Sequence, residues 1–183
     1  AEQEVKSRTA DAKSTAADNR PAGAAAPGAG PATVAASGDE TVMAARPDLL
    51  NPNIETVPRL FPLARKGGDY EFSIDVLRRA KAISPKTPTK SGIMMGLGER
   101  DDEVRRVLGD LREAGVEIVS MGQYLAPERN AFYLPVARFV HPDEFAAWAR
   151  YGKDLGFRHF EAGPLVRSSY HAEKQAGGKR PGE

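Results

Sequence analysis

The chain has 183 residues and a formal net charge of +1, with 26 Lys and Arg against 25 Asp and Glu. A balance this even gives no electrostatic reason to expect binding to nucleic acid or to an anionic membrane. Cysteine is absent, so these residues supply no disulfide, no thiolate nucleophile and no cysteine ligand for zinc or an iron–sulfur cluster. Because the sequence also has neither an apolar run of membrane-spanning length nor a signal-peptide pattern, we expect a cytoplasmic protein.

Residues 1–48 are rich in Ala, Gly, Pro, Ser and Thr and poor in large apolar side chains. Such a segment cannot bury enough apolar surface to offset the entropy lost when its backbone is ordered. We therefore expect residues 1–48 to be disordered, with a docking tail as the functional alternative. Residues 176–183 are expected to form a flexible tail, and the folded part is expected between them, in residues 49–175.

The folded part begins with a proline-punctuated segment, residues 51–60, which suits a strand end and a loop better than a helix. Helical spacing then predicts a helix over residues 70–83, with Asp69 as its N-cap and Ser84-Pro85 as its stop. The expected buried face of this helix consists of Phe72, Val76, Leu77, Ala80 and Ile83.

Two further helices alternate with three short apolar strands, which we expect at residues 89–96, 116–121 and 157–162. Acidic residues 101–103 place the first of these helices, because carboxylates favour a helix N-terminus. Pro142 suits the first position of the second helix, which Gly156 ends. The expected buried stripe of the first helix is Val104, Val107, Leu108 and Leu111. The expected buried face of the second helix is Phe145, Trp148, Ala149, Gly152 and Leu155.

The order helix, strand, helix, strand, helix, strand predicts an α/β fold built from parallel βα units. Three such units do not close a barrel, so the sequence looks like the second half of a larger α/β barrel. Binding groups in such folds gather where the strands end. The polar candidates after successive strands are Asn53 and Glu55, then Lys90 and Ser91 with the glycine run 92–99, then Gln123 and Tyr124, then residues 167–171.

Each candidate has a plainer interpretation. The glycine run allows close approach of a ligand, but a simple turn is the alternative, and it matches neither the dinucleotide nor the phosphate-loop pattern. Glu55 and Glu99 suit an amino group or ribose hydroxyls, or they are solvated. Among the histidines, His141 is expected to cap a helix or lie at the surface, His159 to be a satisfied structural imidazole, and only His171 lies in a polar cluster. No Ser-His-Asp arrangement and no metal-spaced histidine pair is present.

Five stretches resemble lipoyl synthase, a radical S-adenosylmethionine family, in both order and spacing. The resemblance covers about residues 51–175, and the closing Arg-Ser-Ser-Tyr-His run is its most specific part. The stretches are Asn-Ile-Glu-Thr-Val-Pro-Arg-Leu at 53–60, Pro-Thr-Lys-Ser-Gly-Ile-Met-Met-Gly-Leu-Gly-Glu at 88–99, Gly-Gln-Tyr-Leu at 122–125, Val-His-Pro-Asp-Glu-Phe at 140–145 and Gly-Pro-Leu-Val-Arg-Ser-Ser-Tyr-His-Ala at 163–172.

This resemblance implies the second half of a partial βα barrel of the radical S-adenosylmethionine type. It implies an enzyme that inserts two sulfur atoms, at carbons 6 and 8 of an octanoyl chain on a lipoyl-carrier domain. The implied cofactors are S-adenosylmethionine and two 4Fe–4S clusters, and a ferredoxin or flavodoxin is the implied reductant. By the same resemblance Ser169, with Ser168 as the less favoured alternative, is a ligand of the auxiliary cluster. The implied S-adenosylmethionine contacts are Asn53, Glu55, Lys90, Ser91, Gly92, Gly96, Glu99 and Gln123.

The sequence departs from the family at the cluster ligands. The family uses six cysteines and this chain has none, and Pro52 stands where the family generally has histidine. Because one serine cannot hold an iron–sulfur cluster, we expect the chain to be inactive without cysteines from another polypeptide. The alternatives are a non-catalytic truncated remnant or binding module, and a truncated product without a stable fold.

Overall fold

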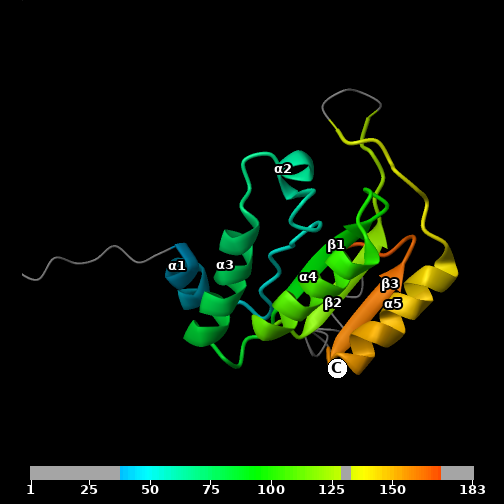
Figure 1. Cartoon of the computed structure of the whole chain (residues 1–183). Coiled ribbons are helices and arrows are strands. Elements are labelled where there is room, and N and C mark those ends of the chain that lie inside the picture. Colours follow the sequence, from blue (N-terminus) through cyan, green and yellow to red (C-terminus); the bar gives the residue numbers. More distant parts are fainter. Residues whose placement is uncertain (1–37, 129–132, 170–183) are drawn as a thin grey trace, which may run out of the picture. The chain divides into compact units, whose positions relative to one another are not determined.

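The computed structural model describes residues 38–128 and 133–169 (Figure 1). Within this part, no helix has the length and apolarity that crossing a membrane requires. The elements are α1 Gly38–Ala44, α2 Phe61–Ala64, α3 Tyr70–Ile83, β1 Lys90–Met95, α4 Asp101–Glu113, β2 Ile118–Gln123, α5 Pro142–Asp154 and β3 His159–Gly163.

The three strands form one parallel sheet in the order β1-β2-β3. Residues 50–55 run parallel beside β1, because Leu50 bridges to Thr89 and Glu55 bridges to Ile93. The predicted α/β class with parallel βα units is therefore confirmed. Strands β2 and β3 begin and end later than the sequence predicts, so Gly122 and Gln123 are the last residues of β2 rather than part of a loop.

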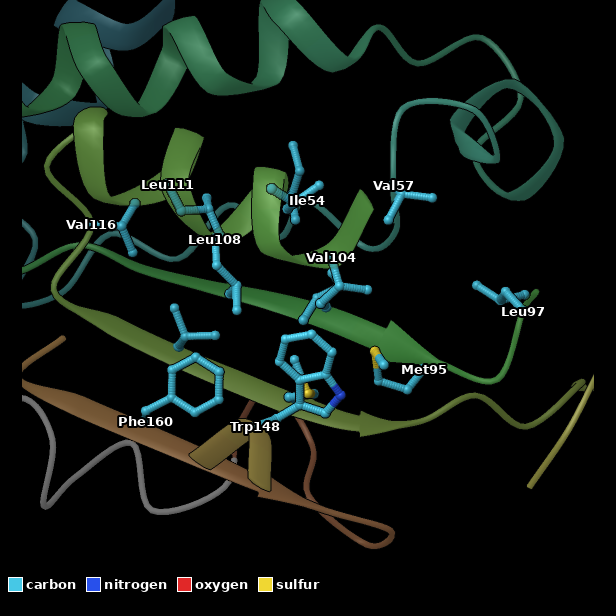
Figure 2. Close-up of a cluster of buried hydrophobic side chains, with 14 of the residues drawn as sticks. Ile54, Val57, Met95, Leu97, Val104, Leu108, Leu111, Val116, Trp148 and Phe160 are labelled. Atoms are coloured by element: carbon cyan, nitrogen blue, oxygen red, sulfur yellow. The ribbon is translucent and has the colours of Figure 1, made fainter. Parts of the chain in front are cut away.

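One face of the sheet packs against α4 and α5 (Figure 1). The strand register turns Ile93, Met95, Val119, Met121 and Phe160 toward these helices, and all five are buried. Figure 2 shows the helical side of this core, to which α4 contributes its predicted stripe and α5 contributes Trp148. All four members of the α4 stripe are fully buried, as predicted: Val104, Val107, Leu108 and Leu111.

Helix α5 begins as predicted, with His141 as N-cap and Pro142 in its first turn. Its Gly152 lies against the Phe160 ring with no room for a Cβ, so the glycine lets α5 approach β3 closely. The prediction for its buried face is right for three residues and only partly right for two. Phe145, Trp148 and Gly152 are buried, whereas Ala149 and Leu155 are half-buried.

Helix α3 has the predicted limits, and the prediction of its buried face is right for Leu77 and Ala80 only. The Asp69 carboxylate accepts the Phe72 N–H at 2.7 Å as its N-cap. The prediction that Phe72 and Ile83 are buried is wrong, because their exposed fractions are 60% and 45%. The Tyr70 hydroxyl donates to Asp110 Oδ2 of α4 at 2.6 Å, and this bond favours the neighbouring stripe as the inner face. The residues of α3 that are buried are Tyr70, Ile74, Leu77 and Ala80.

Helix α1 lies inside the segment whose composition predicts disorder. Its Met43 is 5% exposed, and Asp39 pairs with Arg79 of α3 at 2.8 Å. These two contacts to the folded part order a short helix that has little apolar content of its own. The prediction of disorder for residues 1–37 and of a flexible tail at 176–183 falls outside the described residues.

Candidate functional site

The sheet face opposite the core carries a different set of residues. Because side chains alternate along a strand, the residues two apart from Gly92 and Gly122 share their face. A cavity of about 250 Å³ lies on this face toward the carboxyl ends of the strands. Its lining joins residues from four separate segments: Asn53 and Glu55, then Gly92, Ile93 and Met94, then Ser120, Gly122, Gln123 and Leu125, then Val166, Arg167 and Ser168.

The cavity brings together only some of the predicted contacts. Asn53, Glu55, Gly92 and Gln123 line it, and Lys90, Ser91, Gly96 and Glu99 do not. The expectation that Lys90 and Ser91 lie at a strand mouth is wrong. Strand β1 begins at Lys90, which places both residues at its amino end rather than where the strand ends.

Ser91 and Lys90 have other roles in the sheet. The Ser91 hydroxyl donates to Pro52 O at 3.0 Å and accepts the Ile54 N–H at 3.1 Å, so it fixes the segment that carries Asn53. Lys90 is fully buried, and burial lowers its pKa, while the Glu161 carboxylate acts in the opposite direction. Both side chains are therefore buried in the protein interior and do not line the cavity.

Glu55 is held in the cavity wall in a strained conformation. Its φ is 70°, in the left-handed region that a non-glycine residue rarely adopts. Its N–H donates to Gly92 O at 2.9 Å and its carbonyl accepts the Met94 N–H at 2.8 Å, and these bonds to β1 maintain the strain. Burial raises the pKa of Glu55, opposed by a hydrogen bond from Asn53 and by the charge of Arg65. The carboxylate can accept hydrogen bonds from hydroxyl or amino groups in the cavity.

The glycine run after β1 is closed by its own glutamate. The Glu99 carboxylate accepts the Gly96 N–H at 2.6 Å and the Leu97 N–H at 2.8 Å, so both of its oxygens are engaged. Arg59 donates to Gly98 O at 2.8 Å and makes a bidentate pair with Glu103 at 2.8 and 2.9 Å. The loop is thus preorganised by its own charged groups, and Glu99 acts on the backbone of the loop.

Gln123 fixes the wall on the other side of the cavity. Its amide nitrogen donates to Tyr124 O at 3.0 Å and to Arg138 O at 3.1 Å, and its oxygen accepts the Val140 N–H at 2.9 Å. Gly96 fits against this amide and against Arg138 O, with no space for a side chain. Gln123 therefore ties residues 138–140 to the end of β2, and it leaves both of its amide hydrogens committed.

The segment after β3 folds back over the end of β2. The Val166 N–H donates to Gly163 O at 3.1 Å, and Arg167 Nη1 donates to Val166 O at 2.8 Å and to Pro164 O at 3.3 Å. The Val166 carbonyl occupies the space where a Cβ on Gly122 would lie. We call residues 164–169 the arm. Its contact with Gly122 brings Arg167 and Ser168 into the cavity wall, whereas Ser169 is exposed. His171 lies outside the described residues.

The sequence reasoning missed Ser120 and Glu161. Ser120 is 3% exposed, and its Oγ is buried without a hydrogen-bond partner in the described part of the chain, as are Asn53 Oδ1 and Glu161 Oε2. The strand period could have identified both, because it places Ser120 on the face of Gly122 and Glu161 on that of Gly163. His159 is exposed, so the expectation of a satisfied structural imidazole in an apolar setting is wrong.

The residues present do not fit an iron–sulfur cluster or another metal centre. Within the described ranges, no group of three His, Cys, Asp or Glu side chains is placed to hold a metal ion. Ser169 would contribute a single oxygen, and the 183 residues contain no cysteine. A cluster needs several thiolate ligands, so its remaining ligands have to come from residues other than these.

Curated relatives match most of this chain. It is 53% identical to a lipoyl synthase of Pseudomonas aeruginosa over 136 residues, which is 74% of this chain and 41% of the relative. It is 53% identical to a lipoyl synthase of Hahella chejuensis over 133 residues, 73% of this chain and 40% of the relative. It is 58% identical to a lipoyl synthase of Acidithiobacillus ferrooxidans over 128 residues, 70% of this chain and 40% of the relative. No family model matches the chain.

These relatives confirm the resemblance that the sequence motifs indicate. The chain spans about two fifths of the length of the relatives that it matches, 41% in the case of the Pseudomonas aeruginosa protein. The similarity therefore concerns a part of those proteins.

Proposed function

Because the chain is similar to lipoyl synthases over 74% of its length, we propose that it forms the C-terminal part of a lipoyl synthase site. In this proposal the three-stranded sheet is the second half of a partial βα barrel, and the cavity belongs to the barrel interior. The observation that carries the proposal is the composition of the cavity. Four of the motifs that resemble the family meet in its wall: residues 53–60, 88–99, 122–125 and 163–172.

The cavity suits part of S-adenosylmethionine. Asn53 Oδ1 and Ser120 Oγ are unpaired acceptors in its wall, and the Glu55 carboxylate lies on the same side. Gly92 lines the same wall, and the absence of a side chain there makes room for Asn53, because a Cβ on Gly92 would lie only 2.9 Å from Asn53 Oδ1. When bound and reductively cleaved, S-adenosylmethionine supplies a 5′-deoxyadenosyl radical that abstracts hydrogen. Asn53, Glu55 and Gly92 would bind and orient this cofactor.

The proposed reaction is the insertion of two sulfur atoms into an octanoyl chain on a lipoyl-carrier domain, with a ferredoxin or flavodoxin as reductant. The residues of this chain do not hold the two 4Fe–4S clusters that such a reaction uses. We therefore propose that the chain is inactive alone and works with cysteine-bearing residues outside these 183. What this chain contributes is the cavity wall, the fixed glycine loop and the arm that carries Arg167, Ser168 and Ser169.

A second candidate is a binding module without catalysis. The absence of cysteine favours it, together with the commitment of Glu99 and Gln123 to the backbone rather than to the cavity. In that case the chain would bind octanoylated carrier domains but would not convert them, with or without a cysteine-bearing partner.

One experiment separates these candidates. The full chain is produced together with a second polypeptide that carries the six cysteines implied by the family resemblance, and an octanoylated carrier domain is analysed by mass spectrometry. We expect a product with two added sulfur atoms only when both polypeptides are present. A matched control is Leu63→Ala, which alters an exposed side chain, 56% exposed, away from the cavity and should leave product formation unchanged. Carrier binding without any product would overturn the enzyme proposal in favour of the binding module.

A further inference from the structure

The described part of the chain has half the strands and half the helices of a closed α/β barrel. Residues 50–55 bridge in parallel to β1, and the sheet continues in the order β1-β2-β3, so four parallel extended segments lie side by side. Helices α1, α3, α4 and α5 alternate with these segments along the chain, and the short α2 lies in a connection. A closed parallel barrel has eight strands and eight helices, which is twice this number.

The helices follow the same order as the strands beneath them. Asp39 of α1 pairs with Arg79 of α3 at 2.8 Å, and the Tyr70 hydroxyl of α3 donates to Asp110 of α4 at 2.6 Å. Helices α4 and α5 share the core over one face of the sheet, and the cavity lies on the other face (Figure 2). A helix layer and a strand layer in the same order form the wall of a barrel, with the open face inside.

Residues 50–55 form one end of this wall, with backbone groups directed outward. The Leu50 N–H donates to Pro88 O at 3.0 Å, and Leu50 O accepts the Lys90 N–H at 2.8 Å, so both backbone groups of Leu50 point to the β1 side. Successive residues of a strand direct these groups to opposite sides, so those of Asn51 point away from β1. Asn51 is exposed, and its backbone makes no hydrogen bond to another described residue.

Strand β3 forms the other end of the wall. The His159 N–H donates to Glu117 O at 3.3 Å, toward β2. By the same alternation, the backbone groups of Phe160 and Ala162 point away from β2. Among the described residues, β2 is the only strand that pairs with β3. Each end of the wall therefore presents an edge that can accept a further strand.

Neither edge is blocked against pairing. Sheets usually protect their edges with lysine or proline, and β3, His-Phe-Glu-Ala-Gly, contains neither. Pro52 follows Asn51, so its missing N–H belongs to the β1 side, where the Ser91 hydroxyl donates to Pro52 O at 3.0 Å. Arg65 Nη1 donates to Asn53 O at 3.3 Å, and this carbonyl keeps a second lone pair. Both edges can thus pair with another chain.

We propose that two copies of this chain pair through these edges and close an eight-stranded parallel barrel. A two-fold axis along the barrel sets residues 50–55 of each copy beside β3 of the other, so the two junctions are identical and no edge stays open. The cavity of about 250 Å³ in each copy then faces the barrel interior. This inference goes beyond the proposed function, in which a cysteine-bearing polypeptide would compete for the same two edges.

The first test measures self-association of the full chain by sedimentation velocity over about 1–100 μM. We expect a shift from one-chain to two-chain mass, and a melting temperature that rises with concentration. Ala162→Pro removes an outward N–H from β3, and Asn51→Pro removes one from the opposite edge. Each should weaken dimerisation about tenfold or more, because both junctions of the dimer lose a backbone donor and gain a ring at the edge.

A third proline variant is the matched control. Asp101→Pro changes the first residue of α4, where proline is tolerated, and Arg100 before it has the extended conformation that proline requires, with φ −100° and ψ 154°. This position lies on a helix in the middle of the wall, so dimerisation should not change. Thermal unfolding at the lowest concentration verifies that each variant is still folded as a monomer.

The second test distinguishes the barrel from a dimer that joins two identical edges. The 183 residues contain no cysteine, so Asn51→Cys introduces a unique thiol in each copy. In the barrel the two thiols lie on opposite sides, so a mild oxidant should yield no disulfide-linked dimer. A dimer that joins the two 50–55 edges would bring them together and link them rapidly.

Dimerisation that both edge variants weaken, without the disulfide, supports the proposal. A chain that stays monomeric throughout the concentration range would mean that solvent or another segment of the chain covers the edges, and it overturns the proposal. Sensitivity to only one edge variant, to neither, or rapid disulfide formation overturns it as well. The mass measurement requires no lipoylation, so its failure would leave the proposed function standing.

Discussion

The two faces of the same three-stranded sheet follow opposite rules. The face under α4 and α5 consists of buried apolar side chains, exemplified by Met95 of β1 and Phe160 of β3 (Figure 2). The other face carries Gly92, Ser120 and Glu161, which the register pairs across the three strands. Each of them is adjacent in sequence to a residue of the apolar face. One face contributes most of the stability through burial, and the other leaves polar atoms without partners beside a cavity. The difference indicates which face the protein keeps for a ligand.

The largest effect should come from the covered face. Leu108 is fully buried on α4, so Leu108→Ala should lower the free energy of unfolding by about 2–5 kcal/mol through lost burial and a residual cavity. Urea unfolding of the full chain measures this. The control Leu63→Ala changes a side chain that is 56% exposed and should stay within about 0.5 kcal/mol. Equal losses for the two variants would contradict the assignment of the core.

Replacement of Gly122 by alanine tests whether the segment after β3 packs against β2 on the open face. A Cβ on Gly122 would occupy the position of the Val166 carbonyl, so Gly122→Ala should displace the arm and cost about 1–3 kcal/mol. Gly109 of α4 has nothing within 4 Å of its Cβ position, so Gly109→Ala should be neutral or add up to about 1 kcal/mol. Thermal unfolding compares the two. A Gly122→Ala variant as stable as Gly109→Ala would show that the arm does not rest on β2.

The sequence predicts the covered face better than the open one, for a physical reason. Apolar periodicity reports which residues a helix buries, and it identifies the stripe of α4 and the start of α5 correctly. It fails for α3, where two apolar stripes compete and the hydrogen bond between Tyr70 and Asp110 favours one of them. That bond joins residues far apart in the chain, so no local pattern contains it.

The open face was predicted through motifs, and motifs do not report the direction of a side chain. Glu99 and Gln123 fall in such stretches, yet their hydrogen bonds go to the backbone of neighbouring loops. Lys90 was counted with the residues at the carboxyl end of a strand, although it lies at the amino end both of the predicted strand, residues 89–96, and of β1. Ser120 belongs to no motif in the sequence, and only the register across the strands places it between Gly92 and Glu161.

The glycine loop between β1 and α4 should show an intermediate effect. In Glu99→Gln one oxygen that accepts an N–H at 2.6 or 2.8 Å is replaced by an amide nitrogen, which would oppose that donor. We expect a loss of about 1–2 kcal/mol and faster amide exchange at Gly96 and Leu97. Hydrogen exchange measures the local effect, with exposed Glu113→Gln as the control. Unchanged protection of both amides would argue that Glu99 is free for a ligand.

The smallest effect concerns the ion pair that holds this loop to α4. The Arg59 guanidinium lowers the pKa of Glu103 from its ordinary value of 4.5 to about 2. A carboxylate with a lowered pKa in the folded state stabilises the protein above its ordinary pKa, and this stability is lost as the pH falls from 4.5 to about 2.

The pair is measured as the difference in unfolding free energy between the wild type and Glu103→Gln, because the other carboxylates titrate in both proteins. Since the Arg59 side chain is 48% exposed, solvent screening limits the difference at neutral pH to roughly 1 kcal/mol or less. The difference should shrink as the pH falls from 4.5 toward 2 and should weaken in high salt. A difference that stays constant across this pH range would mean that the ionised and the protonated forms of Glu103 stabilise the protein equally, so that the charge of this carboxylate contributes nothing.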